Sequence, residues 1–287
     1  MRLKSAPGSE RAAAKINLTL EVTGKRDDGY HEIASVMQAV DLCDTLTFEP
    51  SQRLCLTCDV PEMLSPDNLV VRAIRLLQER AGGQPGASVC LDKRIPLAGG
   101  LGGGSSDAAV TLQAVNEMWD LKLGPDDLRG IAARLGSDVP FFLCDGATAL
   151  VTGRGEKVSP IPGPAGTWLV LLKPPLNMAN KTRRMYSGLD PSLYTDGEHT
   201  RRLVDLMKRG ERVDSRFCYN VFDDIACSLL PTLEHYRVRF LAAGASQIHL
   251  AGSGPTLYTV AGDRAEGEDM CNRLKEERLE AYLVRTL

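Results

Sequence analysis

Residues 96–106 read Pro96-Leu97-Ala98-Gly99-Gly100-Leu101-Gly102-Gly103-Gly104-Ser105-Ser106. Apolar residues then recur at the spacing of a helix face, at Ala108, Ala109, Leu112, Val115 and Met118. Backbone N–H groups approach an anion closely only where side chains are absent, and a helix start adds unpaired N–H groups and a positive dipole end. The stretch therefore predicts a phosphate-binding loop before a helix capped by Ser105; the alternative is a flexible turn.

Two common phosphate-binding motifs do not match this loop. A Walker A loop needs Gly-Lys before Ser or Thr, whereas Ser105 follows Gly104 directly. A dinucleotide-binding G-x-G-x-x-G needs a glycine where this chain has Asp107. The sequence thus argues against a P-loop and a Rossmann site, and it leaves the hydroxyls of Ser105 and Ser106 as donors to phosphate or as ligands of magnesium.

Upstream of the loop, residues 12–22 alternate between apolar and polar side chains. Ile16 and Leu18 fall on one face, while Lys15 and Asn17 fall on the other. A period of two predicts a strand, on which Lys15 and Asn17 share a face.

The rest of the chain predicts strands separated by helices, with a helix beginning at Pro66 after a Ser65 cap. The Pro- and Gly-rich residues 159–166 mark the expected domain boundary. Together the elements predict an α+β sandwich of the split βαβ kind. The expected strands are 45–48, 54–58, 87–92, 147–152, 168–172, 248–251, 256–260 and 282–286, and the expected helices are 66–77, 125–135, 199–208, 221–230 and a charged one before the last strand.

Composition indicates an ordinary folded protein. Of the 287 residues, 43% are apolar and 25% are charged, which suits two domains or one large one. The net charge of -3 argues against a surface built for nucleic acid or an anionic membrane. No apolar run approaches the ~20 residues of a membrane-spanning helix, and the polar start lacks the apolar region of a secretory signal. We therefore expect a cytoplasmic protein.

The eight cysteines are irregularly spaced, which is typical of reduced thiols. Cys55 and Cys58 have C-x-x-C spacing, but a zinc site needs a second such pair or nearby histidines. A strand with two half-buried thiols is therefore favoured over a zinc or redox centre.

Three motifs in this order resemble those of the GHMP kinases, a superfamily of small-molecule kinases. They are Ala14-Lys15-Ile16-Asn17-Leu18, the glycine loop, and Gly252-Ser253-Gly254-Pro255. Within the superfamily, Gly24-Lys25-Arg26-Asp27-Asp28-Gly29-Tyr30-His31 and Leu135-Gly136-Ser137-Asp138-Val139-Pro140 resemble segments of the kinases of 4-diphosphocytidyl-2-C-methyl-D-erythritol, which serve non-mevalonate isoprenoid biosynthesis. The resemblance covers essentially the whole chain.

This resemblance implies ATP, magnesium and a two-domain fold. The implied domains are an N-terminal ATP-binding α/β domain like ribosomal protein S5, residues 1–160, and a C-terminal split-βαβ (ferredoxin-like) domain, residues 161–287. The implied reaction is phosphorylation of the 2-hydroxyl of the cytidine compound. A monomer and a weak homodimer both fit.

The resemblance assigns catalytic roles to Asp138 and Lys15. By context alone, Asp138 is a loop or capping aspartate and Lys15 a solvated lysine. The family pattern implies instead that Asp138 takes the proton of the acceptor hydroxyl or orients that hydroxyl. Lys15 would orient the aspartate and stabilise the developing negative charge.

Four residues are implied to hold the acceptor. Tyr30 and His31 end a turn, where such side chains are more often packing or surface groups. The resemblance implies that they form a cytosine pocket with Tyr186, and that Asn17 also contacts the acceptor.

Asn68 and Lys93 are implied to border the nucleotide, together with residues 96–106, although Asn68 is equally well explained as a helix-start residue. Residues 176–182 depart from the Val-Ser-Thr-like segment of the family, so no catalytic role is carried onto them. Thr182 is left as a candidate substrate contact.

Two other functions remain open. A GHMP kinase of a smaller alcohol, such as homoserine or mevalonate, would keep the three motifs. A nucleotide-binding module without catalysis would need only the glycine loop.

Overall fold

A computed structural model describes residues 8–83, 85–164, 166–176 and 180–287. Contacts divide the chain into two compact units. Unit 1 comprises Met1–Ala14, Leu42–Pro96 and Gly102–Asp145, and unit 2 comprises Lys15–Asp41, Leu97–Leu101 and Gly146–Leu287. The long strands β1 (Ser9–Lys25) and β2 (His31–Ser51) each have residues in both units.

The division into domains at residues 160 and 161 remains a prediction about folding units. The contact-defined units divide the chain differently, because residues 15–41 and 97–101 belong with the C-terminal part of the chain. A period-two pattern identifies a strand, but it does not mark where a continuous strand leaves one core and enters another.

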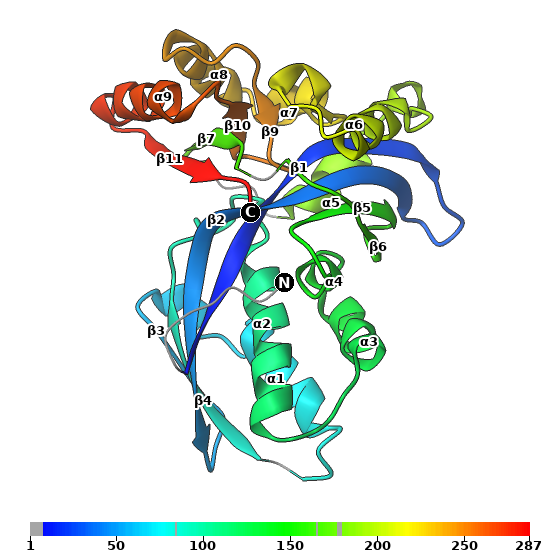
Figure 1. Ribbon diagram of the computed structural model, residues 1–287, viewed down its shortest axis with the longest axis vertical. Helices are drawn as coiled ribbons and strands as arrows, with labels where there is room; N and C mark the ends of the chain where they lie inside the picture. Colours follow the sequence, from blue (N-terminus) through cyan, green and yellow to red (C-terminus); the bar gives the residue numbers. More distant parts are fainter. Residues whose placement is uncertain (1–7, 84, 165, 177–179) are drawn as a thin grey trace. The chain divides into compact units, whose positions relative to one another are not determined.

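Unit 1 consists of strands with helices on one side (Figure 1). β4 (Gly86–Asp92) pairs in parallel with β3 (Cys55–Cys58) and antiparallel with the second half of β2. A 3₁₀ turn, η1 (Pro61–Met63), precedes the first helix. The helices of this unit are α1 (Leu69–Gln78), α2 (Gly103–Met118), α3 (Pro125–Leu135) and α4 (Val139–Phe142).

The packing of α1 against α2 holds the end of the glycine loop in place. α1 buries Val70, Ile74 and Leu77, and α2 buries Ala109 and Leu112, all at 0% exposure. Each fully buried branched side chain of this kind contributes about 1.5–3 kcal/mol. The first turn of α2 is therefore anchored by its own apolar face.

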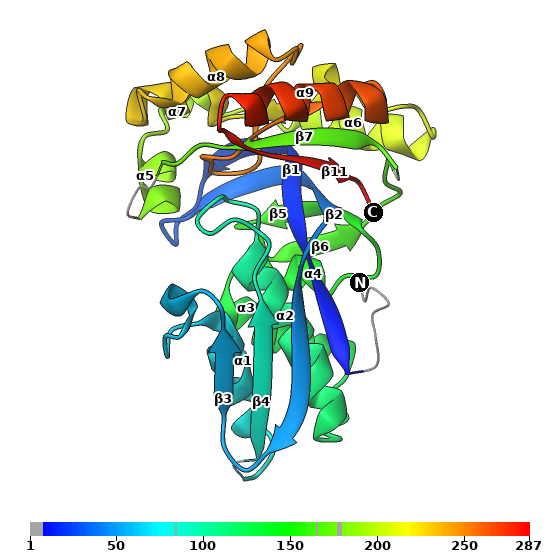
Figure 2. The ribbon, with the colours of Figure 1, turned by 90° about the vertical axis from the view of Figure 1, so that its left-hand side faces the viewer.

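Unit 2 contains a sheet with the strand order β11-β7-β10-β9, in which all neighbours are antiparallel. Residues 169–172, in one of the two inner strands, are all fully buried, so both faces of that strand are covered. Helix α9 (Arg264–Glu276) packs on this sheet beside α8 (Leu233–Ala242) (Figure 2). The strands are β7 (Trp168–Lys173), β9 (His249–Leu250), β10 (Leu257–Val260) and β11 (Glu280–Arg285).

The other strands of unit 2 pair with β1, with β2 or with each other. The first half of β2 pairs antiparallel with β5 (Thr148–Gly153), which pairs with β6 (Lys157–Pro160). β1 pairs in parallel with β8 (Tyr219–Asn220). The remaining helical segments are α5 (Lys181–Ser187), η2 (Pro191–Leu193), α6 (Glu198–Lys208), η3 (Ser215–Phe217) and α7 (Asp223–Leu229).

Two predicted helix starts are wrong. The helix expected from Pro66 begins at Leu69, and its N-cap is Asn68 rather than Ser65. The helix expected to be capped by Ser105 begins at Gly103, after Gly102 with φ 72°. A glycine with positive φ ends the loop earlier than a serine cap does, because it reverses the chain without steric cost.

Other elements were not predicted from the sequence, namely β6, β8, α4, α5, α8, the 3₁₀ turns η1, η2 and η3, and the first part of β2. Across the described ranges, no helix is long and apolar enough to cross a membrane.

Candidate active site

The three sequence motifs meet in unit 2, where β1, the first part of the glycine loop and the late glycine turn hydrogen-bond to one another. Backbone hydrogen bonds therefore hold together three segments that are far apart in the chain. The three bonds run from Lys15 N to Leu101 O at 2.8 Å, from Asn17 N to Ala251 O at 3.0 Å, and from Thr256 N to Gly99 O at 3.3 Å.

Glycine is required where the loop meets the turn. Gly100 has φ +83°, and a Cβ built on it would lie 2.7 Å from the carbonyl oxygen of Gly254. That distance is too short for two non-bonded heavy atoms, and the backbone conformation itself disfavours a side chain. Both effects explain why the two glycine-rich segments can lie backbone to backbone.

Lys15 and Asn17 are buried, each at 5% exposure. Lys15 Nζ donates to Asn17 Oδ1 at 2.8 Å, and Asn17 Nδ2 donates to Ser35 Oγ at 2.7 Å. Buried polar groups need such partners, and these contacts fix the direction of both side chains. The two residues share a face as the strand pattern predicted, and a solvated role for Lys15 is excluded.

Aromatic side chains of the predicted acceptor pocket also come together in unit 2. The rings of His31 and Tyr186 stack with centroids 5.3 Å apart, and Tyr194 meets His31 edge-on at 5.9 Å. Tyr30 is 54% exposed, with the Arg154 guanidinium 5.0 Å from its ring centroid. The structure thus joins His31 to Tyr186, while Tyr30 lies at the surface beside Arg154.

The second part of the glycine loop belongs to unit 1. Gly102 precedes α2, and the N–H of Ser106 donates to Gly102 O at 2.9 Å within its first turn. Ser105 is half-buried, whereas Ser106 is only 1% exposed. Of the two hydroxyls, that of Ser105 is better placed to reach a ligand.

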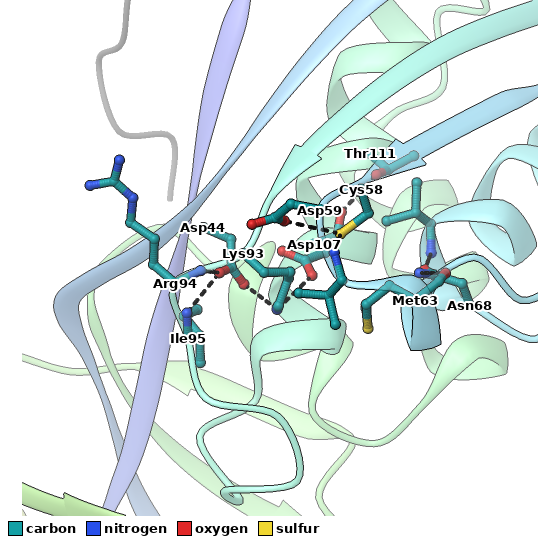
Figure 3. Close-up of polar contacts among 12 residues, drawn as sticks. Asp44, Cys58, Asp59, Met63, Asn68, Lys93, Arg94, Ile95, Asp107 and Thr111 are labelled. Carbon is teal, nitrogen blue, oxygen red and sulfur yellow. Dashed lines mark hydrogen bonds and ion pairs between the residues drawn. The ribbon is translucent and has the colours of Figure 1, made fainter. Parts of the chain in front are cut away.

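Lys93 lies between two carboxylates, that of Asp44 and that of Asp107 on α2 (Figure 3). Its Nζ is 2.5 Å from Asp44 Oδ2 and 3.2 Å from Asp107 Oδ2, and its side chain is 4% exposed. Burial lowers the pKa of Lys93, but attraction to the two carboxylates outweighs burial and raises that pKa above its ordinary value. The structure therefore shows a buried charge cluster, and a contact between Lys93 and nucleotide remains a prediction.

Asn68 caps α1 (Figure 3). Its Oδ1 accepts a hydrogen bond from Val70 N at 2.8 Å, and its Nδ2 donates to Met63 O at 2.8 Å. The helix-start role, which the sequence left open, is thus present in the structure. Its proximity to adenine remains a prediction.

Substitution of Asn68 distinguishes helix capping from nucleotide binding. We expect Asn68→Ala to lower the free energy of unfolding by about 1 kcal/mol, because α1 loses its N-cap. Asn68→Ser keeps a capping oxygen without placing a negative charge beside Met63 O, and it should restore part of that stability in urea titrations. Equal losses for both variants would contradict the capping role, and weaker ADP binding by the Ser variant would support the nucleotide role.

Asp138 lies in unit 1 at the N-cap position of α4, where it is half-buried. As far as the described chain shows, its side chain does not cap that helix, so capping does not account for it. The four residues that follow, 139–142, are all buried and fix its backbone. The carboxylate is therefore held by a rigid segment and is partly accessible.

Magnesium requires oxygen ligands. Within the described ranges no three His, Cys, Asp or Glu side chains gather as a metal site. A magnesium ion that accompanies a nucleotide keeps phosphate oxygens and waters and needs only one or two protein oxygens. The residues present fit such an ion, with the Ser105 hydroxyl as a candidate ligand.

The cysteines of the C-x-x-C pair are free thiols on β3, as the predicted strand requires. Cys58 is half-buried as predicted, whereas Cys55 is exposed.

Lys181, which sequence reasoning did not single out, contacts the carbonyl oxygens of Ala98 and Gly254. Its neighbour Thr182 shares a hydrogen bond of 3.0 Å with Ser253 Oγ. The departure of this segment from the family pattern was the signal that could have drawn attention to Lys181.

Comparison with known proteins places these features in a family. Residues 68–146 match the family model described as GHMP kinases N terminal domain. The 4-diphosphocytidyl-2-C-methyl-D-erythritol kinase of Dehalococcoides mccartyi strain CBDB1 is 43% identical over 277 residues, which cover 96% of this chain and 97% of that protein. The enzyme of the same name from Pelotomaculum thermopropionicum is 39% identical over 282 residues and 96% of each chain.

Solved structures agree with these relatives. A crystal structure of 4-(cytidine 5'-diphospho)-2C-methyl-D-erythritol kinase has a TM-score of 0.81 and 31% identity, and the match covers 97% of this chain and 98% of that one. Homoserine kinase from Cytophaga hutchinsonii has a TM-score of 0.69 at 18% identity over 100% of this chain and 97% of that one, which shows a shared fold alone.

These matches confirm the predicted α+β GHMP kinase fold with two sheets and the predicted class of ATP-dependent kinase. They also confirm the resemblance that the glycine loop and the DGYH run suggested. Because identity reaches 43% over nearly the full length, the chain belongs to the family of 4-diphosphocytidyl-2-C-methyl-D-erythritol kinases within the GHMP kinases.

Proposed function

We propose that this protein transfers the γ-phosphoryl group of ATP to the 2-hydroxyl of 4-diphosphocytidyl-2-C-methyl-D-erythritol. The observation that carries the proposal is the meeting of Lys15 and Asn17 with the glycine loop and the late glycine turn. Relatives that align over nearly the whole chain bear the name of this reaction. In the reaction, the acceptor oxygen bonds to the γ-phosphorus, the bond to the β,γ-bridging oxygen breaks, and ADP leaves.

Asp138 and Lys15 have complementary roles in this proposal. The Asp138 carboxylate accepts the proton of the 2-hydroxyl as that oxygen attacks, or orients the hydroxyl for attack. The Lys15 ammonium, aimed by Asn17, stabilises negative charge on the transferring phosphoryl oxygens. The Lys15 ammonium is set in place by its hydrogen bond before substrate binds, and the buried residues 139–142 fix the backbone that follows Asp138.

The nucleotide is assigned to residues 96–106, with Asn68 and Lys93 nearby. The N–H groups at the start of α2 and the positive end of its dipole favour the phosphate oxygens. Magnesium, when bound, neutralises charge on the phosphates. Ser105 would hold that ion together with the nucleotide.

The cytosine is assigned to the aromatic group of unit 2, with Asn17 and Tyr30 as further acceptor contacts. Burial, and to a lesser extent the charge of Lys25, lowers the pKa of His31 below its ordinary value. This shift favours the neutral imidazole, which offers one hydrogen-bond donor and one acceptor and so suits the edge of a neutral pyrimidine. Tyr186 provides a face on which the base can stack.

Truncation of Tyr186 tests this pocket. We expect Tyr186→Leu to raise KM for the cytidine acceptor by about 10-fold, since a base–aromatic stack contributes ~1–3 kcal/mol. KM for ATP should change by less than about 2-fold, because no part of the adenine or phosphate site is assigned to this ring. Steady-state kinetics with each substrate varied in turn measure both constants. Tyr236→Leu, a similar loss on α8, is the control, and equal increases in both KM values for Tyr186→Leu would remove the residue from the pocket.

Identification of the product tests the proposed reaction. The expected product carries a new phosphomonoester on the 2-hydroxyl, which phosphorus NMR distinguishes from the diphosphate already present. A phosphoryl group on any other oxygen would contradict the assignment.

We propose that this reaction takes place in the cytoplasm, because all eight cysteines are free thiols, as is typical of a reducing compartment. Every residue assigned to the site comes from one chain, so a monomer or a weak homodimer would both suffice.

A further inference from the structure

Lys181, the first residue of α5, brings a third lysine to the glycine-rich part of unit 2. Its Nζ donates to Ala98 O at 3.0 Å and also to Gly254 O. Ala98 belongs to the glycine loop, and Gly254 belongs to the late glycine turn. One ammonium therefore bridges the two motifs whose backbones already lie together at Gly100 and Gly254.

The charged groups that lower the pKa of Lys181 are both positive. They are Lys15 on β1 and Lys173 on β7, which are themselves 5% and 9% exposed. Residues 97–101 and 252–255 contain no titratable side chain. Helix α7, which packs against α5, carries two aspartates, and Asp223 is engaged by His249 at 2.9 Å. The two segments that accept hydrogen bonds from Lys181 therefore offer it carbonyl oxygens and no carboxylate.

The positive charge of Lys181 is disfavoured where this residue lies. Burial, followed by repulsion from Lys15 and Lys173, lowers the pKa of Lys181 to about 8. An anion bound beside Lys181 would favour its charged form. Phosphate groups have the required charge and acceptor oxygens, and a lysine binds them as a point charge.

We propose that Lys181 binds a diphosphate oxygen of a nucleotide ligand. Its ammonium has three N–H donors, of which the two loop carbonyls accept two. The third is directed to the ligand, so that a bound diphosphate completes the bridge between the glycine loop and turn 252–255. The identity of the nucleotide rests on the proposed function: the diphosphate belongs to ATP or to the cytidine diphosphate part of the acceptor.

Calorimetric titration with ADP and, separately, with CDP tests this inference without any catalysis. At pH 7, Lys181→Met should weaken the binding of one of them by at least about 10-fold, the effect of losing one charge-assisted hydrogen bond. Lys181→Arg keeps the charge and should retain most of the affinity. Arg183→Met removes an exposed positive charge from the same helix and is the matched control.

The pattern of losses decides the source of the diphosphate. Loss of ADP binding alone assigns Lys181 to ATP, and loss of CDP binding alone assigns it to the acceptor. Unchanged affinity for both in a folded Lys181→Met variant would overturn the inference. Failure of the wild-type protein to bind either ligand would instead overturn the proposed function, so the two failures are distinguishable.

The pH dependence of ligand binding also distinguishes a lysine that binds the ligand from one that only holds the two loops together. Because the free protein holds Lys181 with a pKa of about 8, raising the pH above that value removes its charge before ligand binds. Wild-type affinity should therefore fall from pH 7 to pH 9, with proton uptake on binding near pH 8.5. Lys181→Arg stays protonated, so its affinity should fall less and its proton uptake should vanish. Identical pH profiles and proton uptake for the two proteins would contradict the role of Lys181.

Discussion

Asp138→Asn should lower turnover by at least ~100-fold, the usual lower bound for losing a general base. The amide is nearly the same size as the carboxylate but cannot accept the hydroxyl proton. Residues 139–142, which fix this segment, are buried and unchanged by the substitution. The fold and the affinity for ADP should therefore stay as in the wild type, and the loss should appear in kcat rather than in either KM.

The matched control is Asp145→Asn, which removes an exposed carboxylate a few residues away. Single-turnover measurements separate the chemical step from product release. If Asp138→Asn turned over near the wild-type rate, Asp138 would have no part in proton transfer. If its ADP affinity fell as well, the residue would act through the nucleotide site instead.

Lys93→Met should lower the free energy of unfolding by about 3–5 kcal/mol, the typical cost of removing one partner from a buried ion pair. The substitution leaves the Asp44 and Asp107 carboxylates, at 0% and 1% exposure, without their shared cation. Asp44 also accepts hydrogen bonds from the backbone N–H groups of Arg94 and Ile95 at 2.6 and 2.8 Å, so it cannot turn away to solvent. Urea titration measures the loss.

Two further variants test whether the loss of stability in Lys93→Met comes from the loss of the buried charge. Arg94→Met removes the neighbouring positive charge, whose side chain is 68% exposed, and should change stability by less than about 1 kcal/mol. Burial, and to a lesser extent the Asp44 carboxylate, raises the pKa of Asp107. Asp107→Asn should therefore be far milder than Lys93→Met, because Lys93 keeps Asp44 as its partner. Equal losses for Lys93→Met and Arg94→Met would contradict the buried-cluster account.

The sequence predicted elements well wherever one pattern continues for a full element. The helix expected over 125–135 and the strand expected over 87–92 agree with α3 and β4 to within one residue. Helix starts were less reliable, because several residues can serve as a cap and only the backbone conformation decides among them. At α2, Gly102 with φ 72° takes that position three residues before Ser105, the first serine that could cap the helix.

Site residues were predictable to different degrees for a similar reason. Lys15 and Asn17 were correctly placed on one face, because strand periodicity alone determines it. The partners of Lys93 could not be predicted, since Asp44 lies 49 residues away in the chain and no local pattern joins them. Lys181 was missed because its segment matches no motif, and its role depends on carbonyls 83 and 73 residues distant.

The most direct test of the proposed reaction is coupled ADP release by the purified protein with ATP and Mg²⁺. The acceptors to compare are 4-diphosphocytidyl-2-C-methyl-D-erythritol, homoserine, mevalonate and galactose. We predict release with the cytidine compound alone, since the aromatic group of His31 and Tyr186 is assigned to its base. Release with homoserine or mevalonate, or ATP binding without release for any acceptor, would contradict the proposed function.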